Sequence, residues 1–221
     1  MSEKKKNVQM SDALSVMAFL TVSGGFQDAY SYFVRGQVFA NAQTGNIVLM
    51  SARLFSGDRS GAVRYLIPLT AFALGVLAAE QIRAKLRGAR RLHWRQLIVL
   101  MEMGMLFLVG FLPHSLDSLA NALVSFSCAM QVQTFRRVNG YAYASTMCIG
   151  NMRSGVESFS AYLRTGDRDL LRKAGHYFLV ILLFALGAGA GSCLAVRGIR
   201  MIWISSALLA VSFLLMFIDR E

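Results

Sequence analysis

The polar run Asn41-Ala42-Gln43-Thr44-Gly45-Asn46 lies between two apolar stretches, about 13–39 and 47–55. Thr44 is a residue type that caps helix N-termini, so we expect a short helix to begin there. The free N–H groups of the first turn would then face the bilayer centre or a cavity, where they favour anions and carbonyl dipoles. The alternative is that Thr44 and Asn46 only cap a short packed helix.

A second Gly-Asn pair, Gly150-Asn151, begins another short apolar segment about one hundred residues later. Arg153 and Glu157 follow it at i, i+4 spacing, which brings both side chains to one helix face. Such a pair either neutralises itself or lines a pathway. We therefore count Gly150, Asn151, Arg153 and Glu157 among the candidate pathway residues.

Asp28 lies within the first long apolar segment, beside Gln27 and after Gly24-Gly25. A carboxylate inside a membrane span is costly and faces the bundle interior or a pathway, which makes Asp28 a candidate for proton coupling. The alternative is that it caps a helix break at Gly24-Gly25 or lies near the outer interface. The second half has Gln131 in the position of Gln27 but no acid beside it, because Val132 follows.

Composition indicates a polytopic membrane protein: 55% of the 221 residues are hydrophobic and 16% are charged. Soluble domains carry about 25% charged residues. The net charge of +11 lies in loops between apolar segments, where cations orient the chain and meet anionic lipid, so we do not expect nucleic acid as a partner. The three cysteines and three histidines are scattered, which predicts neither a metal site nor a cofactor.

The fold class that we predict is all-α, with about six transmembrane helices and two short half-membrane helices. The short segments 45–55 and 151–162 would be less than about 20 Å long as helices, against a hydrocarbon core of about 30 Å. The long segments are about 13–34, 65–82, 97–112, 116–130, 175–195 and 201–218.

The two halves of this single membrane domain, 1–221, resemble each other. Gln27 matches Gln131, Gly45-Asn46 matches Gly150-Asn151, and a Phe-Ala-Leu-Gly sequence occurs at both 72–75 and 184–187. We therefore predict a duplication, with repeats 10–112 and 116–219. With six spans and a cytoplasmic N-terminus, 17 Lys and Arg residues lie inside and six outside, whereas eight spans give 11 and 12. The positive-inside rule favours six spans, which makes the repeat inverted.

The stretch Gly25-Phe26-Gln27-Asp28-Ala29 and the run from Val38 to Asn46 resemble the YoaK-like family of bacterial membrane proteins, also called UPF0700. The sequence from Ala129 to Gln133 is similar to the second-half motif of this family, while Ile149-Gly150-Asn151 departs from the Thr-Gly form of the first half. The resemblance covers nearly the whole chain. It implies a bacterial inner-membrane protein of about six helices without an established activity.

These features lead us to expect a small-solute transporter with a central site between the two short helices and with both termini cytoplasmic. Its expected partners are the lipid bilayer, an unidentified solute and a coupled proton; the sequence leaves open whether it forms a homo-oligomer. One alternative is a non-transporting scaffold or partner subunit. A membrane enzyme acting on lipid or quinone is a third, but no catalytic motif is visible, so we do not expect an enzyme.

Overall fold

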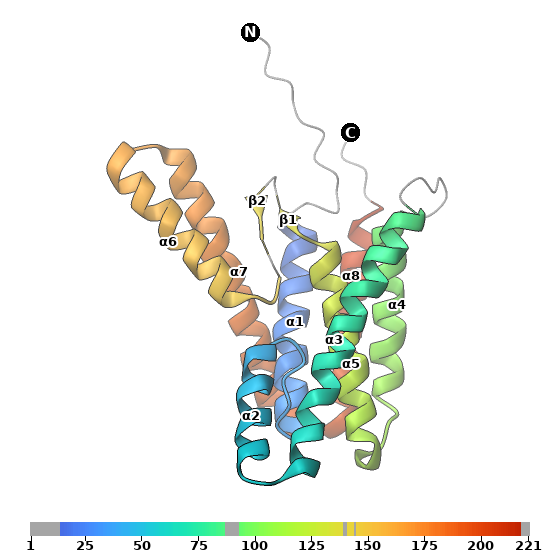
Figure 1. Ribbon diagram of the computed structural model, residues 1–221. Coiled ribbons are helices and arrows are strands. Elements are labelled where there is room, and N and C mark those ends of the chain that lie inside the picture. The colour runs from blue at the N-terminus through green and yellow to red at the C-terminus, as the bar shows by residue number, and fades with distance from the viewer. Residues whose placement is uncertain (1–13, 87–92, 139–140, 144, 218–221) are drawn as a thin grey trace.

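The computed structural model describes residues 14–86, 93–138, 141–143 and 145–217. The regular secondary structure of this part of the chain is helical except for two short strands (Figure 1). The strands pair antiparallel, with Arg137 opposite Ala142. The elements in chain order are α1 (Leu14–Val34), α2 (Gln43–Phe55), α3 (Arg59–Leu86), α4 (Trp94–Val109), η2 (His114–Leu116), α5 (Asp117–Thr134), β1 (Arg137–Val138), β2 (Tyr141–Ala142), α6 (Cys148–Thr165), α7 (Arg168–Leu194), η3 (Ala195–Met201) and α8 (Ile202–Leu215).

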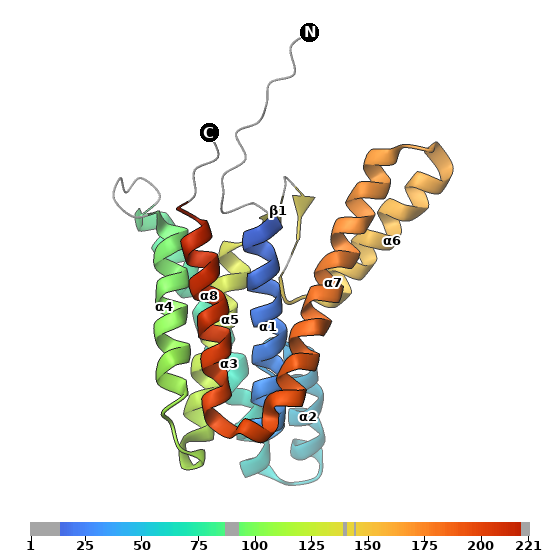
Figure 2. The same cartoon turned by 180° about the vertical axis from the view of Figure 1, so that it is seen from behind.

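The long helices form an upright bundle whose two ends differ in their connections (Figure 1). The start of α1, the end of α3, the start of α4 and the end of α8 lie at the upper end. The turns between α2 and α3, between α4 and α5, and through η3 lie at the lower end, as Figure 2 shows from behind. The termini, and residues 87–92 of the basic loop on which the expected orientation depends, fall outside the described residues.

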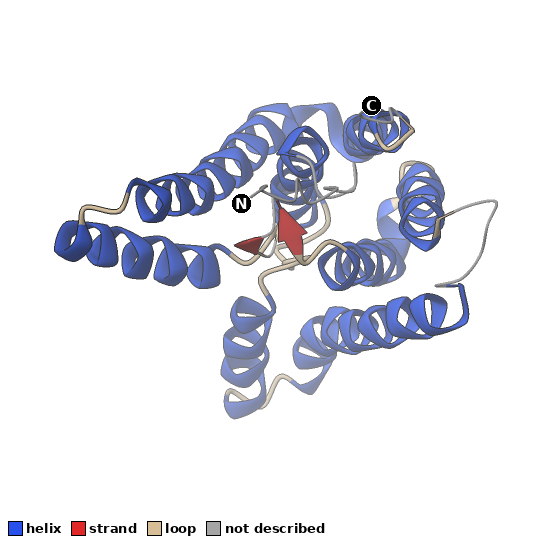
Figure 3. Ribbon diagram, turned by 90° about the horizontal axis from the view of Figure 1, so that it is seen from above, coloured by secondary structure: helices blue, strands red, loops and turns tan. Residues whose placement is uncertain are grey.

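The two short helices begin at about the middle of the bundle and run in opposite directions (Figure 1). Helix α2 descends from there and packs on α3, while α6 rises and packs on α7. Helix α6 and the first part of α7 lean away from the other helices, as Figure 3 shows from above, whereas the rest of α7 packs on α1. With 18 residues, or about 27 Å, α6 is longer than the sequence predicted, because its helix begins at Cys148 and ends at Thr165.

This bundle buries polar side chains among its apolar core residues and exposes many large apolar side chains, which is unlike a soluble protein. Arg35, Gln27 and Glu102 are fully buried, whereas Phe55 is 94% exposed and Ile149 82% exposed. Two described stretches are long and apolar enough to cross a membrane, Arg59–Leu86 and the combined α7–η3–α8 stretch Arg168–Leu215. This distribution is that of a helical membrane protein, whose outer face meets lipid.

Glycines allow two close helix crossings, α1 with α7 and α3 with α5. A Cβ on Gly187 of α7 would lie 2.1 Å from the carbonyl oxygen of Val22 in α1, and a Cβ on Gly75 of α3 would lie 2.4 Å from that of Phe126 in α5. Small residues at such points let membrane helices approach closely. The same residue type therefore positions α1 against α7 and α5 against α3.

Between α1 and α2 the chain reverses direction and returns to the bundle interior. Gly36 and Gln37 both have positive φ, at 88° and 62°, and the Arg64 guanidinium occupies the space that a Cβ on Gly36 would need. Just before this turn, Arg35 donates hydrogen bonds to the carbonyl oxygens of Val109 and Leu112, which end α4. These contacts fix where the returning segment starts.

Candidate functional site

The returning segment 37–42 has irregular backbone inside the bundle, and polar side chains satisfy it. Asn46 accepts from the Phe39 N–H at 3.0 Å and donates to the Phe39 carbonyl at 2.7 Å, so one amide closes the loop on both sides. Gln43 donates to the Ala40 carbonyl at 2.7 Å. Non-helical backbone at membrane depth requires such partners, so Asn46 and Gln43 act first as scaffolding.

Asp28 fastens the same segment to α1. Its Oδ1 accepts the Asn41 N–H at 2.7 Å, the backbone amides of Ala40 and Ala42 lie beside the same carboxyl group, and the residue is 8% exposed. Asn41 in turn donates from Nδ2 to the Gly24 carbonyl at 3.1 Å. Helix α1 continues through Gly24, so the alternative of a helix break there is wrong, and the backbone N–H groups satisfy the buried carboxylate.

A comparable attachment holds the segment before α6. Gln131 of α5 donates from Nε2 to Ser145 Oγ at 3.0 Å and to the Leu20 carbonyl at 3.2 Å. In each half, a long helix thus binds the loop that leads to the short helix. A carboxylate makes the bond in the first half and a neutral amide in the second.

A pocket of about 490 Å³ lies where α2 and α6 begin. Helices α1, α3 and α7 and the segment before each short helix also contribute to its wall. Its lining residues are Asp28, Asn41, Ala42, Gln43, Thr44, Phe72, Thr146, Met147, Cys148, Ile149, Gly150 and Phe184. The two polar segments that the sequence singles out therefore meet in space, although more than one hundred residues separate Thr44 from Gly150 in the chain.

Both short helices begin at this pocket without a side-chain cap among the described residues. The prediction that Thr44 caps α2 is wrong: the helix begins at Gln43, and the N-cap position is held by Ala42. Met147 occupies the N-cap position of α6. In the first turn of α2 the N–H groups of Gln43 and Gly45 already donate to the carbonyl oxygens of Asn41 and Ala42, at 2.8 and 2.9 Å. What each helix start offers a ligand in the pocket is therefore the positive end of its dipole. Phe72 and Phe184 add aromatic surface, and Asp28 adds a carboxylate.

The other predicted site residues do not line the pocket. Gln27 and Gln131 are buried in the bundle beside it, and Asn46 and Asn151 are buried within the short helices. Gly45 lies against the Phe39 ring. Arg153 and Glu157 pair at 2.9 Å on the outer face of α6, with side chains 80% and 62% exposed, so their charges partner each other away from the pocket.

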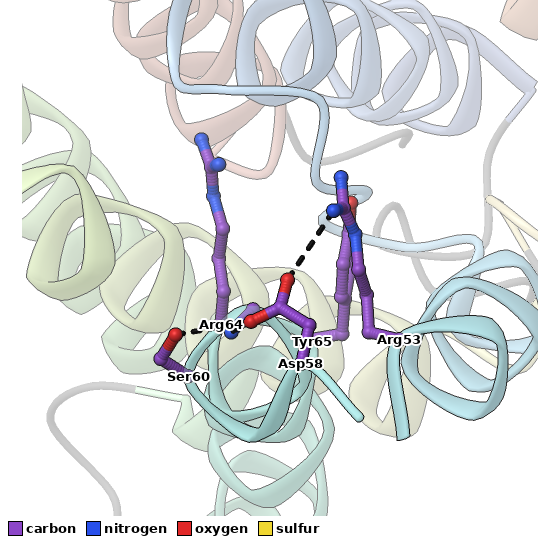
Figure 4. Close-up of a pocket in the computed structure, with 6 residues that line it drawn as sticks. Arg53, Asp58, Ser60, Arg64 and Tyr65 are labelled. Carbon is purple, nitrogen blue, oxygen red and sulfur yellow. Dashed lines mark hydrogen bonds and ion pairs between the residues drawn. The ribbon is translucent and has the colours of Figure 1, made fainter. Parts of the chain in front are cut away.

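A smaller pocket of about 320 Å³ lies at the turn between α2 and α3 (Figure 4). Asp58 accepts from Arg53 at 3.2 Å, from Ser60 at 3.0 Å and from the Gly61 N–H at 2.8 Å. The Gly61 amide, followed by Ser60 and Arg53, lowers the pKa of Asp58 from its usual 3.8. These contacts cap α3, and the turn lies at the end of the bundle, away from the start of α6.

The sequence analysis missed several wall residues of the larger pocket, namely Phe72, Thr146, Cys148 and Phe184. Phe72 and Phe184 are the first residues of the repeated Phe-Ala-Leu-Gly sequence, which we used only to support the duplication. Only the glycine of that sequence packs closely, while the phenylalanine faces the pocket. Treating the repeat one residue at a time would have found both aromatic side chains.

Two comparisons with known proteins found relatives of this chain. The family described as "Protein of unknown function (DUF1275)" matches residues 16–215. A curated relative, the UPF0700 transmembrane protein YoaK of Bacillus subtilis (strain 168), is 23% identical over 183 residues, which cover 79% of this chain and 80% of the relative. No solved structure matches. The resemblance stated from the motifs is thereby confirmed.

Proposed function

This chain belongs to the DUF1275 family of membrane proteins, and we propose that it transports a small solute across the bacterial cytoplasmic membrane. The observation that carries the proposal is the pocket formed where α2 and α6 begin, which has a buried carboxylate in its wall. Discontinuous helices whose N-termini meet at mid-membrane form the substrate sites of many secondary transporters. The proposal includes no enzymatic reaction, cofactor or nucleic-acid partner.

Paired contacts support an inverted repeat. Val22 and Phe126, which Gly187 and Gly75 approach, are separated by 104 residues, the same offset that relates Gln27 to Gln131. Phe72 and Phe184, each three residues before its glycine, both line the pocket. The helices α1 to α4 would then correspond to α5 to α8, with α2 and α6 as equivalents that run in opposite directions.

The transport mechanism follows from this symmetry. Each short helix packs on the next long helix, α2 on α3 and α6 on α7. If the α2–α3 pair moves relative to the other helices, the pocket opens toward the end of the bundle at which α2 ends. The equivalent movement of the α6–α7 pair opens the pocket toward the opposite end. The solute would bind between Thr44 and Gly150 in both states.

Six spans with cytoplasmic termini place the turn at Ser60 outside and the basic loop at Gly88 inside. Single cysteines at these positions, in a protein without Cys128, Cys148 and Cys193, test this orientation with a membrane-impermeant thiol reagent. Labelling of Gly88→Cys from the periplasmic side, or protection of Ser60→Cys from it, would overturn the six-span arrangement.

The transport activity itself is tested by uptake into proteoliposomes, with a panel of amino acids, sugars, nucleosides and inorganic ions as probes. Thr44→Trp places a large ring in the pocket, so we expect it to abolish the uptake that the wild-type protein shows. Val48→Trp, one turn further along α2 on an exposed position that does not line the pocket, is the matched control and should retain uptake. No wild-type uptake of any probe, or equal uptake by both variants, would argue against this site.

A further inference from the structure

Glu102 of α4 is an acid at the centre of the bundle. It is fully buried, and its Oε2 has no hydrogen-bond partner among the described residues. The other oxygen, Oε1, accepts from Gln27 Nε2 at 3.5 Å, and the Ser127 side chain lies beside the carboxyl group. All these neighbours are neutral.

Among the described residues, no cation pairs with this acid. Helix α1 presents Gln27 to it and, one residue on, Asp28, whose carboxyl group is bound to the loop amides. Helix α5 presents Ser127 and Cys128, and the described part of α8 holds no titratable residue. A charged carboxylate so placed would cost several kcal/mol, whereas a neutral acid needs only the weak hydrogen bonds that are present.

A chain of polar contacts joins Glu102 to the pocket. Asn41 lines the pocket, and its side chain lies beside Cys128 on the interior side. The Cys128 thiol donates to Gln27 Oε1 at 2.8 Å, and Gln27 Nε2 reaches Glu102. Asn41 Oδ1 has no partner among the described residues, so the series of polar contacts has an unused hydrogen-bond acceptor at the end nearest the pocket.

We infer that Glu102 is a reversible proton-binding site inside the bundle, linked through Gln27, Cys128 and Asn41 to the solute pocket. The link to solute movement rests on the proposed function, whereas proton binding does not. The step is a proton transfer alone: the carboxylate and a hydronium ion from pocket water give the carboxylic acid and water. Protonated Glu102 stabilises the closed bundle, and its deprotonation favours a state in which water reaches the interior.

The first test is infrared spectroscopy of the purified protein in lipid, because a protonated carboxylic acid has a carbonyl band that carboxylates lack. We expect this band at neutral pH in the wild type, its loss in Glu102→Gln, and its retention in Glu157→Gln, which makes the same change at an exposed position. Absence of the band from the wild type, or its persistence in Glu102→Gln, would overturn the inference.

The second test measures the link to the pocket. Cys148 lies in the pocket wall and Cys128 is buried, so removing the exposed Cys193 leaves Cys148 as the reactive native thiol. In this protein without Cys193, the labelling rate of Cys148 should rise more steeply with pH when Glu102 is present than in Glu102→Gln, whose side chain cannot ionise. Identical pH profiles would refute the link, because thiol ionisation affects both proteins equally.

These outcomes separate this inference from the transport proposal. If both tests succeed and no probe is transported, the proton site is retained and the transport proposal fails. If uptake is found but either test fails, the pocket is retained as a solute site and Glu102 is excluded as its coupled proton site.

Discussion

Asp28 accepts a hydrogen bond from the N–H of Asn41 at 2.7 Å and thereby ties α1 to the segment that precedes α2. Asn41 lies one residue before the N-cap Ala42, so the carboxylate shapes the pocket as well as lining it, by holding the segment that leads into α2. Asp28→Asn keeps an acceptor oxygen but removes the charge, whereas Asp28→Ala also leaves a buried N–H unpaired. We expect folding to survive the first change and to lose about 1–3 kcal/mol of stability with the second.

Uptake measurements on Asp28→Asn then show whether Asp28 or Glu102 binds the proton that is coupled to transport. If Glu102 holds the coupled proton, Asp28→Asn should lower uptake at every pH while leaving the shape of its pH dependence unchanged. Substrate-dependent proton flux in proteoliposomes, at matched protein insertion, is the measurement. Loss of the pH dependence in this variant would instead make Asp28 the coupling group.

Arg35 is the buried cation that secures the turn after α1. It donates to Asp117 at 2.8 Å and to Tyr30 Oη at 2.6 Å, besides the carbonyl groups that end α4. Arg35→Ala should cost about 3–5 kcal/mol, because it strands a carboxylate and several carbonyl groups. Thermal unfolding in detergent measures the loss. Arg53→Ala, which breaks an exposed pair, should cost less than about 1 kcal/mol, and an equal effect of the two changes would contradict this role.

Gly187 and Gly189 are two residues apart on α7 but differ in their surroundings. A Cβ at Gly187 would overlap the backbone of Val22, while one at Gly189 meets nothing within 4 Å. Gly187→Ala should therefore destabilise the protein by about 1–3 kcal/mol. Gly189→Ala should be neutral or stabilise the helix by up to about 1 kcal/mol. Unfolding curves of the two variants in one detergent test whether α7 crosses α1 closely at Gly187. A similar loss of stability in both variants would disprove this close crossing.

The start of α3 should loosen at acid pH. The pKa of Asp58 is lower in the folded state than its usual value of 3.8. The carboxylate therefore contributes to folding stability at pH values above 3.8, and this contribution is lost as the pH falls through the folded-state pKa. Hydrogen exchange at Gly61, whose N–H Asp58 accepts, should accelerate over that range relative to Asp58→Asn at the same pH. If the ratio of the Gly61 exchange rates in the two proteins did not change with pH, the carboxylate would not hold this turn.

The sequence by itself determined the membrane class, the helical segments and the two polar runs that matter most. These features depend on local composition: long apolar segments, a half-length segment after Asn46, and cations that mostly lie outside the long apolar segments. The limits of α6 were less predictable, because hydropathy does not separate Cys148 and Ile149 from the loop before them. The cap of α2 was mispredicted, because Thr44 has the right residue type but lies inside the helix.

Only the tertiary structure decided which polar groups face the pocket and which hold the fold. Asn46 turns back to satisfy its own loop, and Gln43 does so while also lining the pocket, whereas Thr44 and Gly150 line the pocket from the two short helices. The physical reason is that buried irregular backbone must find hydrogen-bond partners, and its path in three dimensions decides which side chains are used for that purpose. Glu102 depended on the structure in another way, because only its neighbours on other helices show that it is buried and has no cation partner among the described residues.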